Sequence, residues 1–369
     1  MPSFCWTALT KTWNGRTTSA GSRTRVLRDT PSDTFIEWQA VRARLLFIAG
    51  LLALAAIAAP IAFADNGGFT PVAPASPNAE GIRDAYVFVS IFVLGIFVLV
   101  EGLLIAFIVR YRRRKRPRFE DGAPIHGATK LELLWTAIPV VILFLIGAFV
   151  FIELPGIKDI PSARAGGQLE IRVTGRQFYW QYEYPNGVIA IDTMRAPAGV
   201  PVRLEVTAPD SDVIHSWWIP ALGGKIDAIP GTVNETWFEV ESPGVYTGQC
   251  AELCGLEHAR MLASVEVMPE AEFAAWLERR RAEQEAGSGE LGKETWEGVC
   301  AKCHGLAGEG GIAKAPAAAL LADPQTVETI VRNGRTTRRG TMPAVGSGWT
   351  SEQVEALANY LKENPPSGG

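Results

Sequence analysis

The sequence predicts a multi-domain chain that consists of a two-helix membrane hairpin, an all-β sandwich or barrel and a small all-α domain. Its 369 residues exceed what one compact core usually holds. Hydrophobic residues make up 47% of the chain, and the long apolar runs lie before residue 153. Beyond that point, alternating apolar segments separated by proline and glycine give way to helical spacing near the C-terminus.

Charge and cysteine content narrow the classes of function. The net charge of −4 gives no indication of a nucleic-acid partner. Four of the five cysteines form two closely spaced pairs, and the total is odd. This arrangement is not typical of a disulfide framework and favours metal binding or haem attachment.

The N-terminal segment, residues 1–64, is predicted to contain a signal peptide. An apolar run over residues 45–61 follows two arginines and leads to a small-x-small cleavage pattern that ends at Ala64. A first transmembrane helix is the alternative, but Pro60 and the shortness of the run favour cleavage. The polar residues before Val41 fit no targeting signal, so we expect translation to begin at Val41.

Residues 80–154 are predicted to form the transmembrane hairpin. The apolar spans Ala85–Val109 and Leu133–Ile152 are each long enough to cross a bilayer of ~30 Å. The basic block Arg110–Arg118 between them belongs on the cytoplasmic side, which places everything after the second span outside the cytoplasm. Glu101 lies within the first span, where a structural hydrogen bond to another subunit is favoured over a functional role.

Residues 165–268 are predicted to form the all-β domain. Apolar and aromatic residues alternate in LEIRVTGRQFYWQYEYP, VRLEVTAP, TWFEVES and ASVEVMP, and proline or glycine separates these segments. Candidate metal ligands fall between the predicted strands, where a rigid β scaffold holds loops in place.

Two thiolates, two imidazoles and a thioether come from two places in this domain. They belong to His215, Cys250, Cys254, His258 and Met261. Such soft ligands select copper or iron over magnesium or calcium. The two cysteines can bridge two copper ions, each capped by one imidazole, with Met261 and the backbone carbonyl of Glu252 as weak further ligands. A structural Cys₂His₂ zinc site is the alternative, but it would not explain Met261 or the membrane hairpin.

Residues 289–369 are predicted to form a haem domain. The motif Cys300-Ala-Lys-Cys303-His304 is the attachment signature of a c-type haem, in which the thiols bond the vinyl groups and His304 ligates the iron. Met342 is the expected sixth ligand, and Met/His ligation is typical of a relatively high-potential electron carrier. Half of a zinc site is the alternative for such a motif.

The segments around the haem motif are predicted to be structural. Residues 269–288 contain an amphipathic helix that runs into a Gly/Ser linker, and its charged face is interpreted as a solvated spacer. Core positions at helical spacing in the closing helix are Leu357, Tyr360 and Leu361. The basic residues near the haem edge are Arg335, Arg338 and Arg339. They either steer an electron donor or keep the surface solvated, and we favour the second interpretation.

Four stretches of the chain resemble subunit II of the haem-copper cytochrome c oxidases. They are HGATKLELLWTAIP, GRQFYWQYEYP, DVIHSWWIPALGGKIDAIPG and YTGQCAELCGLEHARM, and the resemblance extends from the signal peptide to Met268. The C-terminal region is similar to a class I cytochrome c domain. The resemblance implies a cupredoxin-like fold for the β domain, with a binuclear copper centre. Its ligands would be His215, Cys250, Glu252, Cys254, His258 and Met261.

The resemblance also implies roles for individual acidic and aromatic side chains. Glu252 is similar to a residue that binds magnesium at the interface with subunit I, and Glu132 to one at the entrance of a proton pathway. For Glu132, a charge favoured by the helix N-terminus is an equal alternative. Where the family commonly has a tryptophan at which electrons enter, this chain has Phe178, followed by Tyr179 and Trp180. Phe178 and Trp180 are therefore the candidates for that role.

The resemblance implies subunit II of a proton-translocating terminal oxidase in the bacterial cell membrane, with its own cytochrome c domain. We expect it to relay electrons from its haem through the copper centre to the haems of subunit I, where dioxygen is reduced to water. The chain alone would be a relay and not an oxidase. Expected partners are subunit I, the other oxidase subunits and an external donor such as a cytochrome c or a quinol–cytochrome c reductase complex. A tethered haem domain acts as a high local concentration of donor, which would relax the need for a tryptophan at Phe178.

Three other functions fit less well. A quinol oxidase subunit shares the hairpin and the sandwich but typically lacks the copper ligands. A membrane-tethered copper-delivery protein needs no haem motif. A nitrous-oxide-type reductase would need a large His-rich domain, which the four histidines of this chain cannot supply.

Overall fold

The computed structural model describes residues 71–112, 124, 126–161, 167–287, 290–338 and 340–367. The predicted signal peptide, the expected start at Val41, most of the basic block between the apolar spans, and Arg339 lie outside these residues.

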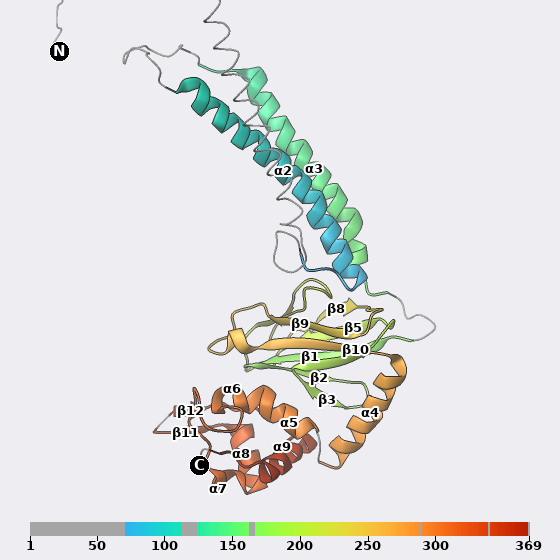
Figure 1. Cartoon of the computed structure of the whole chain (residues 1–369), viewed down its shortest axis with the longest axis vertical. Coiled ribbons are helices and arrows are strands. Elements are labelled where there is room, and N and C mark those ends of the chain that lie inside the picture. Colours follow the sequence, from blue (N-terminus) through green and yellow to red (C-terminus); the bar gives the residue numbers. More distant parts are fainter. Residues whose placement is uncertain are drawn as a thin grey trace, which may run out of the picture. The chain divides into compact units, whose positions relative to one another are not determined.

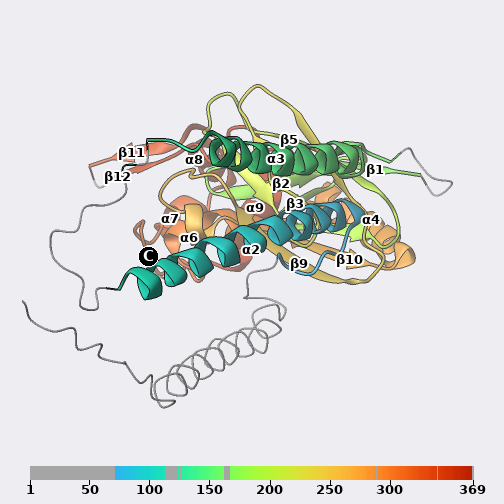
Figure 2. The same ribbon diagram turned by 90° about the horizontal axis from the view of Figure 1, so that it is seen from above.

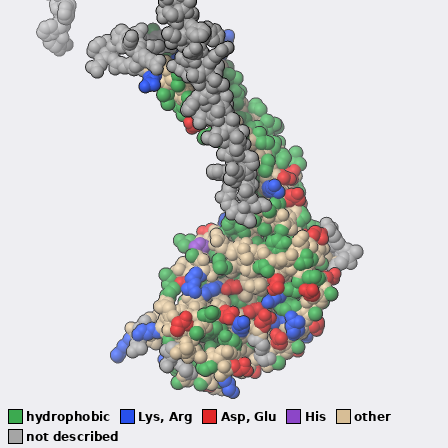
Figure 3. All heavy atoms as spheres, viewed as in Figure 1, with side chains coloured by type: hydrophobic (Ala, Val, Ile, Leu, Met, Phe, Trp, Pro, Cys, Tyr) green, Lys and Arg blue, Asp and Glu red, His purple; other side chains and the backbone are tan. Residues whose placement is uncertain are grey.

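Two long helices form the first part that the structure describes. α2 (Pro77–Tyr111) and α3 (Thr129–Lys158) lie side by side (Figures 1 and 2), and the rings of Phe88 and Phe149 stack with centroids 4.1 Å apart. Both helices are long and apolar enough to cross a membrane. Most of their apolar side chains are exposed, and Figure 3 shows hydrophobic side chains along them. This arrangement agrees with the predicted hairpin.

Two five-stranded sheets follow and pack face to face as a sandwich. The strand order is β3-β2-β1-β5-β8 in one sheet and β4-β10-β9-β6-β7 in the other. β1 pairs in parallel with β5, and β10 with β4, while the other pairs are antiparallel. The strands are β1 Leu169–Arg176, β2 Tyr179–Glu183, β3 Ile189–Ile191, β4 Thr193–Pro197, β5 Val202–Thr207, β6 His215–Trp218, β7 Ile226–Ala228, β8 Asn234–Phe238, β9 Gly244–Cys250 and β10 Leu262–Met268.

Alternating burial identifies the inner faces of the sheets. In β5, Val202, Leu204 and Val206 are buried, whereas the residues between them are partly exposed. β10 shows the same period of two. Because successive side chains of a strand point to opposite faces, this pattern buries one face of each strand in a shared core. The predicted all-β sandwich is confirmed.

The chain crosses from one sheet to the other at Asp192, between β3 and β4. Its φ of 57° lies in the left-handed region, which aspartate tolerates better than most residues. Asp192 Oδ1 accepts a hydrogen bond from the Trp180 N–H at 2.9 Å, and the Asp192 carbonyl accepts one from the Ser264 N–H at 2.9 Å. Asp192 is therefore anchored to strands of both sheets.

The helix after the sandwich is packed and not merely a solvated spacer. In α4 (Glu270–Glu285), Phe273 and Trp276 lie in the core of the sandwich, and Arg280 is only 1% exposed. The Arg280 guanidinium donates to the Ile189 carbonyl and pairs with Glu294. The prediction of a solvated charged face is wrong at this arginine, because its partners come from segments distant in the sequence.

The C-terminal domain is mainly helical. Its elements are α5 Glu290–Thr295, the π-helical turn η2 Trp296–Cys300, α6 Ala301–His304, α7 Ala318–Leu321, α8 Pro324–Asn333, β11 Arg335–Thr337, β12 Gly340–Met342 and α9 Ser351–Glu363. α9 packs across α5 at Gly292, where an added Cβ would lie 2.2 Å from the Ala356 carbonyl oxygen. Leu357 and Leu361 are buried and Tyr360 is half-buried against the same core, as the helical spacing predicted.

Candidate metal centre and haem attachment site

Strand pairing brings the distant candidate ligands together. β6 begins at His215 and β9 ends at Cys250, and these antiparallel strands pair with Trp217 opposite Cys250. The loop after Cys250 returns through the short helix η1 (His258–Arg260) to Met261, whose carbonyl accepts a hydrogen bond from the Cys250 N–H at 2.9 Å. The backbone thus closes the loop around its own sulfur atoms.

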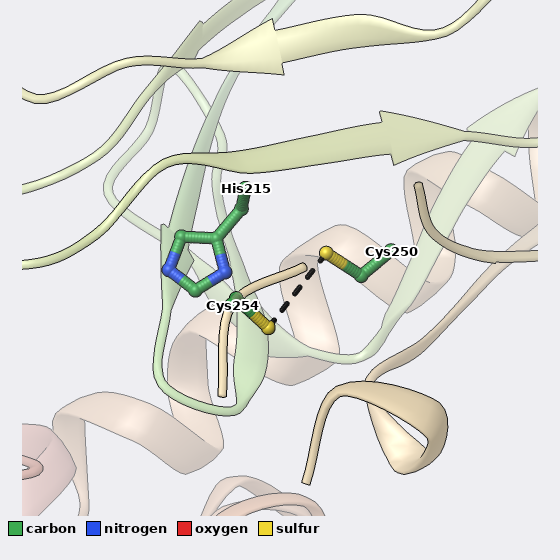
Figure 4. A group of neighbouring side chains, drawn as sticks. All are labelled: His215, Cys250 and Cys254. Carbon is green, nitrogen blue, oxygen red and sulfur yellow. Dashed lines mark hydrogen bonds between the residues drawn. The ribbon is translucent and has the colours of Figure 1, made fainter. Parts of the chain in front are cut away.

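The thiols, the thioether and the second imidazole converge inside this loop. Cys250 Sγ lies 3.9 Å from Cys254 Sγ (Figure 4) and 3.2 Å from the Glu252 carbonyl oxygen. Cys254 Sγ lies 3.6 Å from His258 Nδ1 and 3.8 Å from Met261 Sδ. Both cysteines and Met261 are buried. All the ligands predicted from this loop therefore meet in one place.

His215 completes the group. The imidazole, Cys250 and Cys254 offer ligand atoms that all lie within 4.8 Å of one another. His215 Nε2 lies 3.2 Å from Asp212 Oδ1, while the buried Nδ1 has no hydrogen-bond partner among the described residues. Asp212 thus fixes the tautomer, and Nδ1 keeps a lone pair. A metal ion bound by the thiolates would satisfy this nitrogen, so the donor set fits copper.

The protonation of the site also fits metal binding. A hydrogen bond from the Cys254 thiol lowers the pKa of Cys250, and the neighbouring Cys250 thiolate raises the pKa of Cys254. The metal-free pair therefore retains one proton, which binding of both sulfurs to copper would displace. Burial raises the pKa of Asp212, but hydrogen bonds from His215 and two backbone N–H groups outweigh burial and lower it overall.

The aromatic residues border the metal centre. The rings of Trp180 and His215 meet edge to face, with centroids 6.1 Å apart. The Phe178 ring lies against the loop at Gly255, where an added Cβ would be 3.0 Å from Phe178 Cε1. Both predicted positions for electron transfer are thus in contact with the site or its loop, although their role stays a prediction.

The carboxylates of the two glutamates that the resemblance singled out have partners other than the sulfur atoms. The Glu252 side chain is 46% exposed, and its carboxylate lies 3.8 Å from Lys225 Nζ. Glu132 Oε1 accepts a hydrogen bond from the Ala128 N–H at 3.1 Å in the first turn of α3. The structure thus shows a capping role for Glu132, and magnesium binding and proton uptake stay predictions.

The haem motif lies at the end of the α5–η2–α6 run. His304 Nδ1 donates to the Lys314 carbonyl at 2.7 Å, which leaves Nε2 available to an iron ion. Burial raises the pKa of Cys300 to about 12, so this thiol is protonated at neutral pH before attachment. Cys300 and Met342 both pack against the hydrophobic core of this domain. These residues fit a covalent haem with Met342 as the second axial ligand.

Three residues with notable contacts were not predicted from the sequence, namely Asp212, Lys302 and Arg280. Asp212 stands three residues before His215, a spacing that could have indicated a partner for the imidazole. Lys302 occupies a variable position of the haem motif, and its side chain contacts Asp192. No local pattern identifies such contacts.

Three families of known proteins match the chain in successive segments. Residues 65–152 match the family "Cytochrome C oxidase subunit II, transmembrane domain", and residues 188–268 match "Cytochrome C oxidase subunit II, periplasmic domain". Residues 287–361 match "Cytochrome C oxidase, cbb3-type, subunit III". The order of these matches confirms the predicted membrane hairpin, cupredoxin-like domain and cytochrome c domain.

Individual relatives agree with these matches. Cytochrome c oxidase subunit 2 of Alkalihalophilus pseudofirmus is 33% identical over 316 residues, which cover 79% of this chain and 90% of that protein. The subunit 2 of Cereibacter sphaeroides is 36% identical over 256 residues, which cover 58% of this chain and 80% of that protein. The crystal structure of the periplasmic domain of cytochrome oxidase subunit II from Bradyrhizobium japonicum is 38% identical and covers 33% of this chain and 97% of that one, with a TM-score of 0.31.

Proposed function

This chain belongs to the cytochrome c oxidase subunit II family, and we propose that it carries electrons from its own haem c through two copper ions to the haems of subunit I. The family membership makes the chain a membrane-bound subunit of a haem-copper terminal oxidase with a periplasmic domain and a fused cytochrome c domain. The proposal concerns the cofactors, the order of electron transfer and the partners.

One observation carries the proposal: the soft ligands converge around the buried His215 Nδ1, which has no hydrogen-bond partner in the part of the chain that the structure describes. The proposed copper ligands are His215, Cys250, Glu252 through its carbonyl, Cys254, His258 and Met261. Bound copper would supply a site that accepts and donates one electron at a time. The buried residues exclude water from it, and the strands β6, β9 and β10 hold the ligands still as the charge changes.

Haem c is the proposed source of these electrons. Cys300 and Cys303 would bond it, while His304 and Met342 would ligate its iron. The haem held by these residues would supply one electron at a time to the copper site, which would pass it on to subunit I. Reduction of dioxygen to water, coupled to proton pumping, belongs to the assembled oxidase.

The partners follow from the same assignment. We propose that subunit I contacts the loop from Cys250 to Met261, here called the copper loop. The exposed Glu252 carboxylate would be a magnesium ligand at that interface. Glu132 would stand near the entrance of a proton pathway. An external cytochrome c or a quinol–cytochrome c reductase complex would reduce the haem.

Optical and EPR spectra of the purified full chain test the proposal. We expect the signal of a mixed-valence copper pair together with a c-type haem band in equal amounts. Cys250→Ser should abolish the copper signal and keep the haem band, whereas Cys303→Ser should do the reverse. Binding of a single type 2 copper ion, or of zinc in place of copper, would overturn the assignment.

A further inference from the structure

The haem motif is bound directly, through its own lysine, to the β sandwich that carries the candidate copper ligands, here called the copper domain. Lys302 lies between the two motif cysteines, and its Nζ is 2.6 Å from Asp192 Oδ2 and 2.8 Å from the Phe178 carbonyl oxygen. The Lys302 side chain is only 11% exposed. We infer that Lys302 is a positioning residue, which holds the haem domain in one fixed pose on the copper domain. The pose itself follows from the contacts, and only its role in electron transfer rests on the proposed function.

The acceptor on the copper domain is rigid. Asp192 Oδ1 accepts from the Trp180 N–H, and the Asp192 backbone bonds to Trp180 and Ser264 on strands of different sheets. The second carboxylate oxygen is the one that meets Lys302. Hydrogen bonds between charged groups are stronger than neutral ones, and a mostly buried pair is screened little by salt.

A second bond at the same residue runs in the opposite direction. Arg260 Nη1, from the copper domain, donates to the Lys302 carbonyl at 2.8 Å. Arg260 belongs to η1, between the candidate ligands His258 and Met261, and Glu257 orients it at 3.1 Å. Lys302 therefore donates two hydrogen bonds to the copper domain and accepts one from the loop that carries the candidate copper ligands.

The aromatic stretch at the start of β2 forms the rest of the contact. The Tyr179 hydroxyl donates to the Val345 carbonyl at 2.9 Å and accepts from Trp349 Nε1 at 2.7 Å, and both partners belong to the haem domain. The next side chain, Trp180, points to the other face and packs against His215. Bonds and contacts thus lead continuously from the haem motif to a candidate copper ligand.

Close apolar packing leaves little freedom between the two domains. Ile189 and Ile191 of β3 share a hydrophobic cluster with Leu291 and Trp296 of the haem domain. At Gly298, two residues before the motif, an added Cβ would lie 2.6 Å from Ile191 Cγ2. A haem domain seated in this way does not act as a freely moving donor at high local concentration. Transfer from haem to copper should therefore be independent of ionic strength and solvent viscosity.

The test uses the detergent-solubilised full chain loaded with haem and copper. The variants Lys302→Met and Asp192→Asn remove the ion pair from opposite sides, and Lys362→Met, an exposed lysine of α9, is the matched control. Copper reduction is followed after photoreduction of the haem at low and high salt and at two viscosities. Loss of the Lys302–Asp192 ion pair should lower the docked fraction relative to the undocked about tenfold or more. The rate should then depend on salt and viscosity in both variants, with partial recovery in Lys302→Arg.

Hydrogen exchange provides a readout that does not require electron transfer. In the wild-type chain and in Lys362→Met, the amide of Trp180 should exchange slowly, and it should exchange about tenfold faster both in Lys302→Met, which leaves the acceptor of this amide in place, and in Asp192→Asn. Unchanged exchange and unchanged, salt-independent rates in both variants would overturn the role of Lys302. If the wild-type haem fails to reduce copper at all, the proposed function is wrong, and the exchange experiment still decides the role of Lys302.

Discussion

Replacement of Asp212 by alanine should weaken copper binding while the β sandwich stays folded. Asp212 Oδ1 accepts from the Val213 N–H at 2.8 Å and from His215 Nε2–H at 3.2 Å, and Oδ2 accepts from the Gln177 N–H at 3.2 Å. Alanine removes both acceptor oxygens and with them all three hydrogen bonds. The His215 ring then loses the partner that fixes its tautomer and keeps Nδ1 free for the metal.

The structure sets the expected size of the effect. Loss of a partner that orients a metal-ligating histidine lowers metal affinity about 10- to 100-fold, which corresponds to about 1.4–2.7 kcal/mol. The imidazole bond of 3.2 Å is at the long end for a hydrogen bond, so we expect the lower half of this range. Asp212→Asn keeps one acceptor oxygen and should fall between alanine and the wild type.

Competition with a copper chelator measures the affinity, and the haem band of the same sample reports whether the chain is intact. Asp323→Asn is the matched control, because Asp323 also accepts backbone hydrogen bonds but caps α8 in the haem domain. An affinity of Asp212→Ala within twofold of the wild type, with an unchanged EPR signal, would refute the role of Asp212.

Three further predictions concern the packing of the two domains. Gly292→Ala should destabilise the haem domain by about 1–3 kcal/mol, because the added Cβ would lie 2.2 Å from a backbone carbonyl oxygen of α9. Thermal unfolding followed at the haem band measures the change in stability, and an unchanged Tm would contradict this prediction. Arg280→Met should cost about 3–5 kcal/mol, because it leaves Glu294 buried without this partner, and adding Glu294→Gln should restore part of the loss. The exposed neighbour Arg281, replaced by methionine, should change the free energy of unfolding by less than about 1 kcal/mol in the same denaturant titration. Burial raises the pKa of Tyr179 above its ordinary value of about 10. The stability that the neutral phenol contributes is therefore complete below about pH 10 and is lost as the pH rises further. Tyr179→Phe should reduce this alkaline decrease in Tm, measured between about pH 9 and pH 11, and an equal decrease in the variant would count against the prediction.

Local patterns in the sequence were sufficient for the fold class and for the candidate ligands. Apolar runs of membrane length predicted α2 and α3, and the period of two in VRLEVT predicted β5 with its inward-facing valines and leucine. The haem motif and the cysteine loop are short, so chain connectivity alone keeps their residues near one another. His215 was included because it stands out chemically, and the pairing of β6 with β9 then explains how it reaches Cys250.

The contacts between domains could not be read from the sequence. The composition of the charged helix after the sandwich predicts a solvated face. Arg280 on this helix is nevertheless buried, because Glu294 lies opposite it in the folded chain. Lys302 has no special position in the haem motif, and only the crossover at Asp192 provides its partner. Arg280 and Glu294 belong to different helices, and Lys302 and Asp192 are 110 residues apart, so neither pair follows from a local pattern.

The sequence by itself determined the kinds of domain, their order and the chemistry of both redox sites, because periodicity and ligand spacing are local properties. Only the tertiary structure decided which groups face one another. It shows that His215 Nδ1 is buried without a hydrogen-bond partner among the described residues, which fits a metal ligand. It also shows Asp212 at the other ring nitrogen and the Lys302–Asp192 pair that joins the haem motif to the copper domain. The physical reason is that hydrogen bonds and ion pairs act over a few ångströms in space, whatever the separation along the chain.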